Sequence, residues 1–175
     1  MKLLKLAEYS GRFVVTTQKG ILILVSLMLS GVMVTEVVLR YFLDLDIWGW
    51  EELAMIFAMW LYMIGAAMAA HDRSHLKTEV MSLLLKDPRK LRIVVAIATL
   101  IALVMAGFMT YWSSDLVLWG LKKHSETPVY GIPWVVAQSS LFFAGILIMI
   151  YFLHELVDNI RDILSPGDSP AWRAE

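Results

Sequence analysis

Four long apolar stretches make up most of this 175-residue chain. They are Gly20–Leu39, Leu53–Ala70, Ile93–Ser114 and Val129–Leu153, and the only charged residue inside any of them is Glu36. Because an α-helix rises about 1.5 Å per residue, about 20 residues cross a hydrocarbon core of about 30 Å. Each stretch is long enough to span a bilayer. The predicted fold class is therefore an all-α membrane protein with four transmembrane helices.

The composition excludes several other classes of protein. Hydrophobic residues make up 59% of the chain and charged residues 18%, which leaves too little polar surface for a disordered chain or a soluble helical domain. The chain has no cysteine, so it has no disulfide, thiolate metal site or cysteine nucleophile. Neither a glycine-rich phosphate loop nor a nucleophile–base motif occurs, and we expect no enzymatic activity.

Lysine and arginine predict the orientation of the four spans. The N-terminal segment and the connection between the second and third spans carry most of them: Lys2, Lys5, Arg12, Lys19, Arg73, Lys77, Lys86, Arg89, Lys90 and Arg92. The other two connections carry Arg40, Lys122 and Lys123. By the positive-inside rule, the basic segments are cytoplasmic, so both termini are predicted to lie inside the cell.

Tryptophan residues gather at the predicted outer ends of the spans. They are Trp48, Trp50, Trp112, Trp119 and Trp134. Tryptophan favours the membrane–water boundary, and we expect Trp112, Trp119 and Trp134 to anchor the outer side, with His75 and Lys77 on the inner side. The one-sided excess of aromatic residues also fits an outer rim where a partner packs, and the sequence leaves both interpretations open.

The segments outside the spans have their own patterns. Residues 1–19 alternate apolar and basic positions, which predicts a helix lying on the cytoplasmic membrane surface and turning into the bilayer near Gly20. Apolar residues at 76, 80, 83 and 84 predict a short in-plane helix before the third span. Within a transmembrane domain of residues 20–157, the spans are expected at about 20–42, 51–70, 92–119 and 131–157. Residues 158–175 are expected to form a flexible cytoplasmic tail.

Glu36 and Arg40 are spaced to form an ion pair on one helix. A glutamate four residues before an arginine is the favourable order, and pairing lowers the cost of each charge near lipid. We interpret the pair as structural or as a contact with another subunit. The alternative function is a small proton-coupled exporter that uses Glu36, but this residue lies near the outer boundary and not at mid-bilayer.

The histidines permit two further hypotheses. His71 and His75 have the spacing of a helical zinc site, but the third ligand is lacking and Asp72 stands where a metalloprotease needs glutamate. With His154, they could ligate a haem in the membrane anchor of a redox complex. All of them lie at the ends of spans, so anchoring of the helix ends is the simpler interpretation.

Several motifs occur in the order found in one transporter family. They are Arg40-Tyr41-Phe42, Trp50-Glu51-Glu52-Leu53, Trp60, Gly65-Ala66-Ala67, His75-Leu76-Lys77-Thr78-Glu79 and Tyr130-Gly131-Ile132-Pro133. Over about residues 20–157, the chain resembles the small membrane subunit (DctQ type) of TRAP, or tripartite ATP-independent periplasmic, transporters. An alternative assignment, the membrane subunit of a tricarboxylate-type tripartite transporter, differs from this one only in the family to which the chain would belong.

The resemblance implies a division of labour in a bacterial inner membrane. A large multi-span subunit (DctM type) holds the substrate and sodium sites and moves as an elevator. A periplasmic binding protein delivers an organic acid anion, and the small subunit supports the large one without binding substrate. We therefore expect no cofactor or nucleic acid on this chain and sodium in the large subunit, and we allow for a bound phospholipid. The substrate itself, whether dicarboxylate, sugar acid or sulfonate, stays open.

The resemblance also implies contact residues. Trp50, Glu51 and Glu52 match the outer motif, and Arg40 matches the family arginine at the end of the first span; these four are expected to face the large subunit or the binding protein. We assign Glu36 and Trp48 to the same contact. His75 matches the family histidine at the inner end of the second span. The family often has arginine where this chain has Met55, and it is usually apolar at Glu36, so individual ion pairs between subunits do not carry over directly.

Overall fold

A computed structural model of the chain describes residues 2–45, 48–84 and 88–164, with side chains described for 14–45, 48–72, 91–161 and 163–164. It contains four helices, α1 (Lys2–Phe42), α2 (Trp50–Leu84), α3 (Pro88–Lys123) and α4 (Val135–Leu164). Each has a part that is long and apolar enough to cross a membrane: Val14–Phe42, Trp50–Asp72, Leu91–Lys123 and Val135–Arg161. The prediction of an all-α chain with four helices that are long and apolar enough to span a membrane is confirmed for the described residues.

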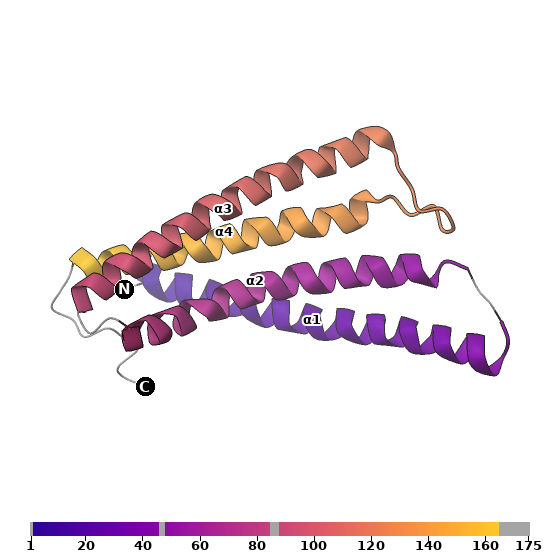
Figure 1. The fold of residues 1–175 in the computed structure, drawn as a ribbon, viewed down its shortest axis with the longest axis horizontal. Coiled ribbons are helices and arrows are strands. Elements are labelled where there is room, and N and C mark those ends of the chain that lie inside the picture. The colour runs from indigo at the N-terminus through magenta and orange to yellow at the C-terminus, as the bar shows by residue number, and fades with distance from the viewer. Residues whose placement is uncertain (1, 46–47, 85–87, 165–175) are drawn as a thin grey trace.

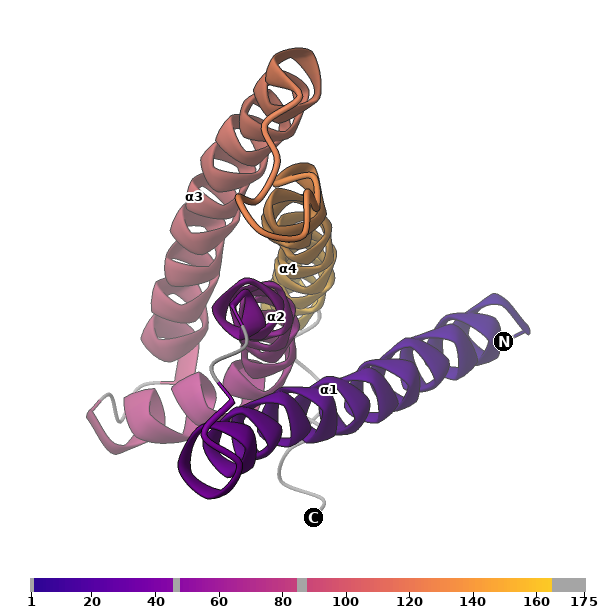
Figure 2. The ribbon, with the colours of Figure 1, turned by 90° about the vertical axis from the view of Figure 1, so that its right-hand side faces the viewer.

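The helices form an open row and not a closed bundle. In the order α1–α2–α4–α3, each helix packs mainly on its neighbour, and α3 meets α2 over a short stretch (Figure 2). The end of α1, the start of α2 and the α3–α4 connection lie at one end of the row (Figure 1). We call this the outer end. The other end holds the start of α1, the end of α2, the start of α3 and the end of α4, and we call it the inner end.

The α3–α4 contact is close because glycine lies in it. A Cβ atom added at Gly145 would lie 2.6 Å from Thr110 Oγ1, and one added at Gly120 would overlap the side chain of Gln138. Small residues let two membrane helices approach until their backbones nearly touch. The largest side chains that are less than 2% exposed are Thr99 on α3 and Ser140 on α4.

α1 is held along a single seam. Its half-buried residues recur every three or four positions: Leu22, Val25, Leu29, Val32, Glu36 and Leu39. This is the spacing of a helix that packs on one neighbour with one stripe. No residue in the most apolar part of α1 is buried. In the corresponding parts of α2, α3 and α4, 17%, 17% and 22% of the residues are buried. Most of α1 is therefore left for lipid or for another protein.

Several predicted boundaries differ from the structure. α1 is one continuous helix through Gly20, so the predicted turn there is absent from the described helix. The helix expected before the third span is the continuation of α2 to Leu84, and Figure 2 shows the last turns of α2 running across the axis of its first part. α4 begins at Val135 because residues 131–134 belong to the preceding loop, and its helix includes 158–164, which were assigned to the tail. Residues 165–175 lie outside the described residues.

Candidate functional site

The connection between α3 and α4 is a folded loop. Glu126 and Pro133 form an antiparallel bridge, and the amide of Trp134 donates to the carbonyl of Ser125 at 3.0 Å. Within the loop, the amide of Ile132 donates to Thr127 Oγ1 at 3.0 Å. Gly131 has a φ of +63°, a conformation that glycine adopts without strain. The Tyr130-Gly131-Ile132-Pro133 motif therefore forms the turn of this hydrogen-bonded loop.

Glu52, in the first turn of α2, holds this loop. Its Oε1 accepts a hydrogen bond from the amide of Val129 at 2.8 Å, and its Oε2 accepts one from the amide of Tyr130 at 3.1 Å. A carboxylate that accepts two amides at once fixes orientation as well as distance. Glu52 thus joins α2 to a loop that follows it by 77 residues. Sequence reasoning missed this role, because the paired glutamates also suit the start of any helix.

Gly49 lets the loop approach the start of α2. Its φ is +105°, and an added Cβ would lie 2.5 Å from the ring of Tyr130 and 2.9 Å from the side chain of Val129. Both the backbone conformation and the space therefore require glycine at this position. The Trp48-Gly49-Trp50 motif is where the two outer connections meet.

A cleft of about 490 Å³ lies at this meeting point, and we call it the outer cleft. Its walls come from the end of α1, the start of α2 and the α3–α4 loop: Glu36, Arg40, Trp48, Gly49, Trp50, Glu51, Glu52, Met55, Pro128, Val129 and Trp134. All six residues that were assigned to a partner contact line this one cleft, and Trp134 joins them. The structure therefore gathers the predicted contact residues in one place, and their contact with a partner stays a prediction.

The predicted ion pair between Glu36 and Arg40 is not formed. Among the residues with described side chains, neither is within 4.0 Å of an opposite charge. The reason is the seam of α1: Glu36 occupies a half-buried seam position that faces α2, whereas Arg40 is exposed. Glu52 is engaged with the loop. The outer cleft therefore presents the charges of Glu36, Glu51 and Arg40 without ion-pair partners among the described residues.

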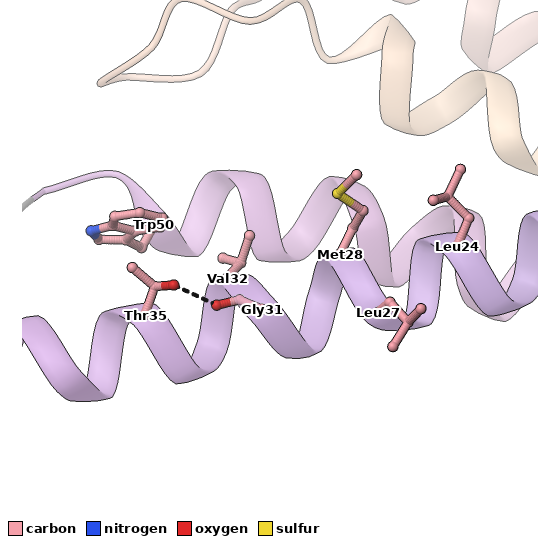
Figure 3. Close-up of a pocket in the computed structure, with 7 residues that line it drawn as sticks. All are labelled: Leu24, Leu27, Met28, Gly31, Val32, Thr35 and Trp50. Carbon is pink, nitrogen blue, oxygen red and sulfur yellow. Dashed lines mark hydrogen bonds between the residues drawn. The ribbon is translucent and has the colours of Figure 1, made fainter.

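An apolar groove of about 350 Å³ runs beside the outer cleft on α1, and we call it the α1 groove. It is lined by Leu24, Leu27, Met28, Gly31, Val32, Thr35 and Trp50 (Figure 3). The Thr35 hydroxyl donates to the carbonyl of Gly31 at 2.7 Å, so it presents no free donor to the groove. Trp50 lines both the groove and the cleft, and this makes them neighbours.

A polar layer near the inner end was not predicted. The Thr99 hydroxyl donates to Glu155 Oε1 at 3.0 Å, which joins α3 to α4. The Tyr151 hydroxyl donates to Gln18 Oε1 at 2.6 Å, which joins α4 to α1. The sequence analysis assigned no role to any of these four residues. Hydrogen bonds between helices satisfy polar groups that lipid cannot.

The histidines engage neighbouring side chains. His71 Nδ1 lies 3.1 Å from Asp72 Oδ1. The rings of His71 and Tyr151 form a T-shaped pair, with 5.1 Å between their centres. His154 Nδ1 lies 3.1 Å from Asp158, one turn along α4. Among the described side chains, no group of three or more His, Cys, Asp or Glu residues has the geometry to hold a metal ion. The side chains of His75 and Lys77 lie outside the described residues, so their anchoring role stays a prediction.

Trp112 and Trp119 lie on α3, away from the residues of the outer cleft. Their exposed fractions are 63% and 52%, and Lys123 Nζ lies 5.4 Å from the centre of the Trp119 ring. Exposure at the end of a span is what an interfacial anchor requires. Their anchoring role, like that of Trp134, stays a prediction.

Comparisons with known proteins agree with these features. The family described as tripartite ATP-independent periplasmic transporters, DctQ component, matches residues 29–162. A protein of Haemophilus influenzae, provisionally named as a TRAP transporter small permease protein, is 26% identical over 132 residues, which cover 75% of this chain and 76% of that protein. The matched range includes the outer cleft and the whole of the α3–α4 loop.

Proposed function

Because this chain belongs to the DctQ family, and is thus the small permease subunit of a TRAP transporter and a multi-pass inner membrane protein, we propose that it is the fixed scaffold of a sodium-coupled importer of an organic acid anion. In this proposal, a large DctM-type subunit carries the substrate and the sodium ions. A periplasmic binding protein delivers the substrate. Both termini of this chain are cytoplasmic, so the outer cleft faces the periplasm.

The four helices are unbroken, and this favours a scaffold role for the chain in the transporter. Transporter sites near the bilayer midplane are usually built from interrupted helices, whose free backbone groups coordinate ions and substrate. α1–α4 each run unbroken through their candidate spans. In the described spans, the buried hydroxyl of Thr99 and the carboxylate of Glu155 bond to each other and form no part of either cavity. This arrangement favours a chain that holds a transporter in position.

The proposal of a protein contact rests on the outer cleft. It gathers Glu36, Arg40 and Glu51, which have no ion pair among the described residues, with the aromatic walls of Trp48, Trp50 and Trp134. Complementary charges on a partner guide association and fix the orientation of an interface, and tryptophan and arginine are typical of its central contacts. We assign the cleft and the adjoining part of α1 to the contact with the large subunit or with the docked binding protein.

Reconstituted transport tests this function. Proteoliposomes would contain the chain alone, the large subunit alone, or both, with the binding protein added and a sodium gradient imposed. A panel of dicarboxylates, sugar acids and sulfonates serves as substrate. We expect uptake from the complete system and none from the chain alone. Uptake by the chain alone, or proton-driven efflux abolished by Glu36→Gln, would overturn the scaffold function.

A further inference from the structure

Tyr62 places a hydroxyl group at the middle of a membrane span without a hydrogen-bond partner. It lies near the centre of the candidate span Trp50–Asp72, and at least about 15 Å of helix separates it from either end. Its side chain is 65% exposed and forms no hydrogen bond within the described part of the chain. Serine and threonine can bond to a carbonyl of their own helix, whereas the phenol of tyrosine stands too far from its backbone. The hydrocarbon core offers no water, so Tyr62 requires an acceptor on another molecule.

Two serines of α1 also leave their hydroxyls open. Elsewhere in the spans, Tyr151 donates to Gln18, and Ser140 donates to a carbonyl of its own helix. Ser26 and Ser30, in contrast, are exposed and form no hydrogen bond within the described residues. Both lie near the middle of the candidate span of α1, Val14–Phe42. The two helices that form the α1–α2 seam therefore each present unpaired hydroxyls at this depth.

Ser26 lies at the depth of Tyr62. A Cβ atom added at Gly65 would lie 3.9 Å from the side chain of Leu22, and this contact fixes the register of the antiparallel helices α1 and α2 (Figure 1). From Leu22 to Ser26, α1 rises about 6 Å toward the outer end. From Gly65 to Tyr62, α2 rises about 4.5 Å in the same direction. The two residues are thus within about 2 Å of the same depth.

Ser26 and Tyr62 lie on the side of the seam that carries the outer cleft. On α1, Ser26, Met33 and Arg40 are exposed and follow one another at heptad spacing, so they form one edge of the seam. On α2, Met55 and Tyr62 are exposed at the same spacing. Arg40 and Met55 both line the outer cleft. The cleft therefore continues toward the middle of the membrane between these two edges. We call this continuation the hydroxyl strip, and it consists of Ser26, Met33, Met55, Tyr62 and Ala66.

A transmembrane helix fits the hydroxyl strip better than lipid does. An acyl chain has no hydrogen-bond acceptor, and a lipid headgroup stays at the membrane surface. Ser26 and Ala66 are small, which lets a neighbouring helix approach closely, and polar side chains form hydrogen bonds between membrane helices. A second copy of the chain is a poorer match. Parallel pairing along the α1 edge would bring the exposed Lys19 and Arg40 of one copy beside the same cations of the other.

We propose that the hydroxyl strip binds a transmembrane helix of the large subunit, and that this helix presents a hydrogen-bonding side chain to Tyr62 and Ser26 at mid-bilayer depth. The inference rests on the proposed function and narrows it, because a periplasmic binding protein cannot reach this depth. The contact with the large subunit thus extends from the outer cleft along both α1 and α2.

Photocrosslinking identifies the partner. The photoreactive amino acid p-benzoylphenylalanine replaces Tyr62 in the full-length chain, which is co-expressed with the large subunit and the binding protein and illuminated in membranes. We expect an adduct with the large subunit. The same replacement of Tyr111, an exposed residue of α3 at the other edge of the row, is the control and should give no such adduct. An adduct of Tyr62 with the binding protein or with a second copy, or no protein adduct, overturns the proposal.

Affinity measurements test the hydrogen bond and the packing separately. The labelled chain is titrated with the large subunit in micelles, and binding is followed by energy transfer. Tyr62→Phe removes only the hydroxyl and should weaken binding about threefold, whereas Tyr111→Phe should not. Ser26→Leu blocks the close approach and should weaken binding at least about tenfold, whereas Gly107→Leu, at an open position of α3, should not. Tyr62→Phe should leave unfolding of the isolated chain unchanged, because no bond within the chain is lost. Variants that bind no more weakly than their controls contradict the proposal.

The same titration keeps this inference separate from the proposed function. If the large subunit binds the original chain and binds Tyr62→Phe and Ser26→Leu equally well, the hydroxyl strip is not the contact, while the proposed function holds. If the large subunit never binds the original chain, the proposed function fails, and this inference fails with it.

Discussion

α1 and the α3–α4 pair are attached to the molecule in opposite ways. α3 and α4 meet through glycine at Gly120 and Gly145 and through the buried hydroxyl of Thr99, so their contact is tight and internal. α1 lies against α2 with one stripe of half-buried side chains, and the most apolar part of it contains no buried residue. Lipid provides no hydrophobic force between helices, so association depends on packing and hydrogen bonds. The comparison predicts that the α3–α4 contact contributes more to the stability of the chain than the contact of α1 with α2 does.

Breaking the tight pair should have the largest effect. Gly145→Leu forces a side chain into Thr110 and should destabilise the α3–α4 contact by about 3 kcal/mol, the upper range for overpacking. The measurement is reversible unfolding of the chain in mixed micelles. Gly107→Leu on α3 is the matched control, because an added Cβ there meets nothing within 4 Å. Equal stability of the two variants would show that α3 and α4 are not in close contact at Gly145.

The next largest effect should come from the carboxylate that fixes the outer loop. Glu52→Ala removes the acceptor of the Val129 and Tyr130 amides, and we expect hydrogen exchange at these two amides to rise at least about tenfold. Glu51→Ala removes a neighbouring carboxylate that makes no hydrogen bond to the loop in the part of the chain that the structure describes, so it should leave the exchange unchanged. Unchanged exchange in Glu52→Ala would mean that the loop is held by its own hydrogen bonds.

The hydrogen bond inside the tight pair should contribute less. Thr99→Val keeps the shape of a fully buried side chain and removes its bond to Glu155, which should cost about 1 kcal/mol of unfolding free energy. Thr35→Val is the control, because that hydroxyl is exposed and bonds within its own helix. If both variants are equally stable, Thr99 and Glu155 do not join α3 to α4 in the membrane.

The hydrogen bond between α1 and α4 should show the smallest effect. Tyr151→Phe removes only the hydroxyl that donates to Gln18, and the loss should be about 0.6 kcal/mol. A pair of spin labels on α1 and α4 would show a broader distance distribution in the variant, since α1 is held by few other contacts. Tyr62→Phe, on an exposed side chain of α2 with no hydrogen bond in the described structure, is the control. A distribution as narrow as in the original chain would contradict the weak attachment of α1.

The four helices could be predicted from the sequence, and six of the residues that line the outer cleft stood out in it, for a simple reason. The length of a span and the charges at its ends follow directly from the order of residues in the chain. Arg40 and Glu51 belong to motifs of consecutive residues, which are also visible in the sequence. The row order of the helices and the Glu52 bond to the α3–α4 loop depend on which distant residues meet, and no local pattern records that. The i, i+4 spacing of Glu36 and Arg40 was misleading, because the seam with α2 takes Glu36 and leaves Arg40 exposed.

The polar layer could have been suspected but not located. Gln18, Tyr151 and Glu155 were visible as polar residues beside apolar runs. Their partners follow from the way in which α1, α3 and α4 cross, and the local sequence does not specify that crossing. The three-and-four spacing from Leu22 to Leu39, which marks the side of α1 that faces α2, is visible only as burial in the structure, because most residues between these positions are also apolar.

The most direct test of the central claim is recovery of the large subunit by charge-reversed variants of this chain. Arg40→Glu alters the outer cleft, and Lys122→Glu makes the same kind of change at an exposed residue in the last turn of α3, which does not line the cleft. Equal amounts of each tagged chain, co-expressed with the large subunit and the binding protein, are purified in parallel. The account predicts that Arg40→Glu recovers at least about tenfold less large subunit than Lys122→Glu, which should match the original chain. Full recovery with Arg40→Glu would contradict a subunit contact at the outer cleft.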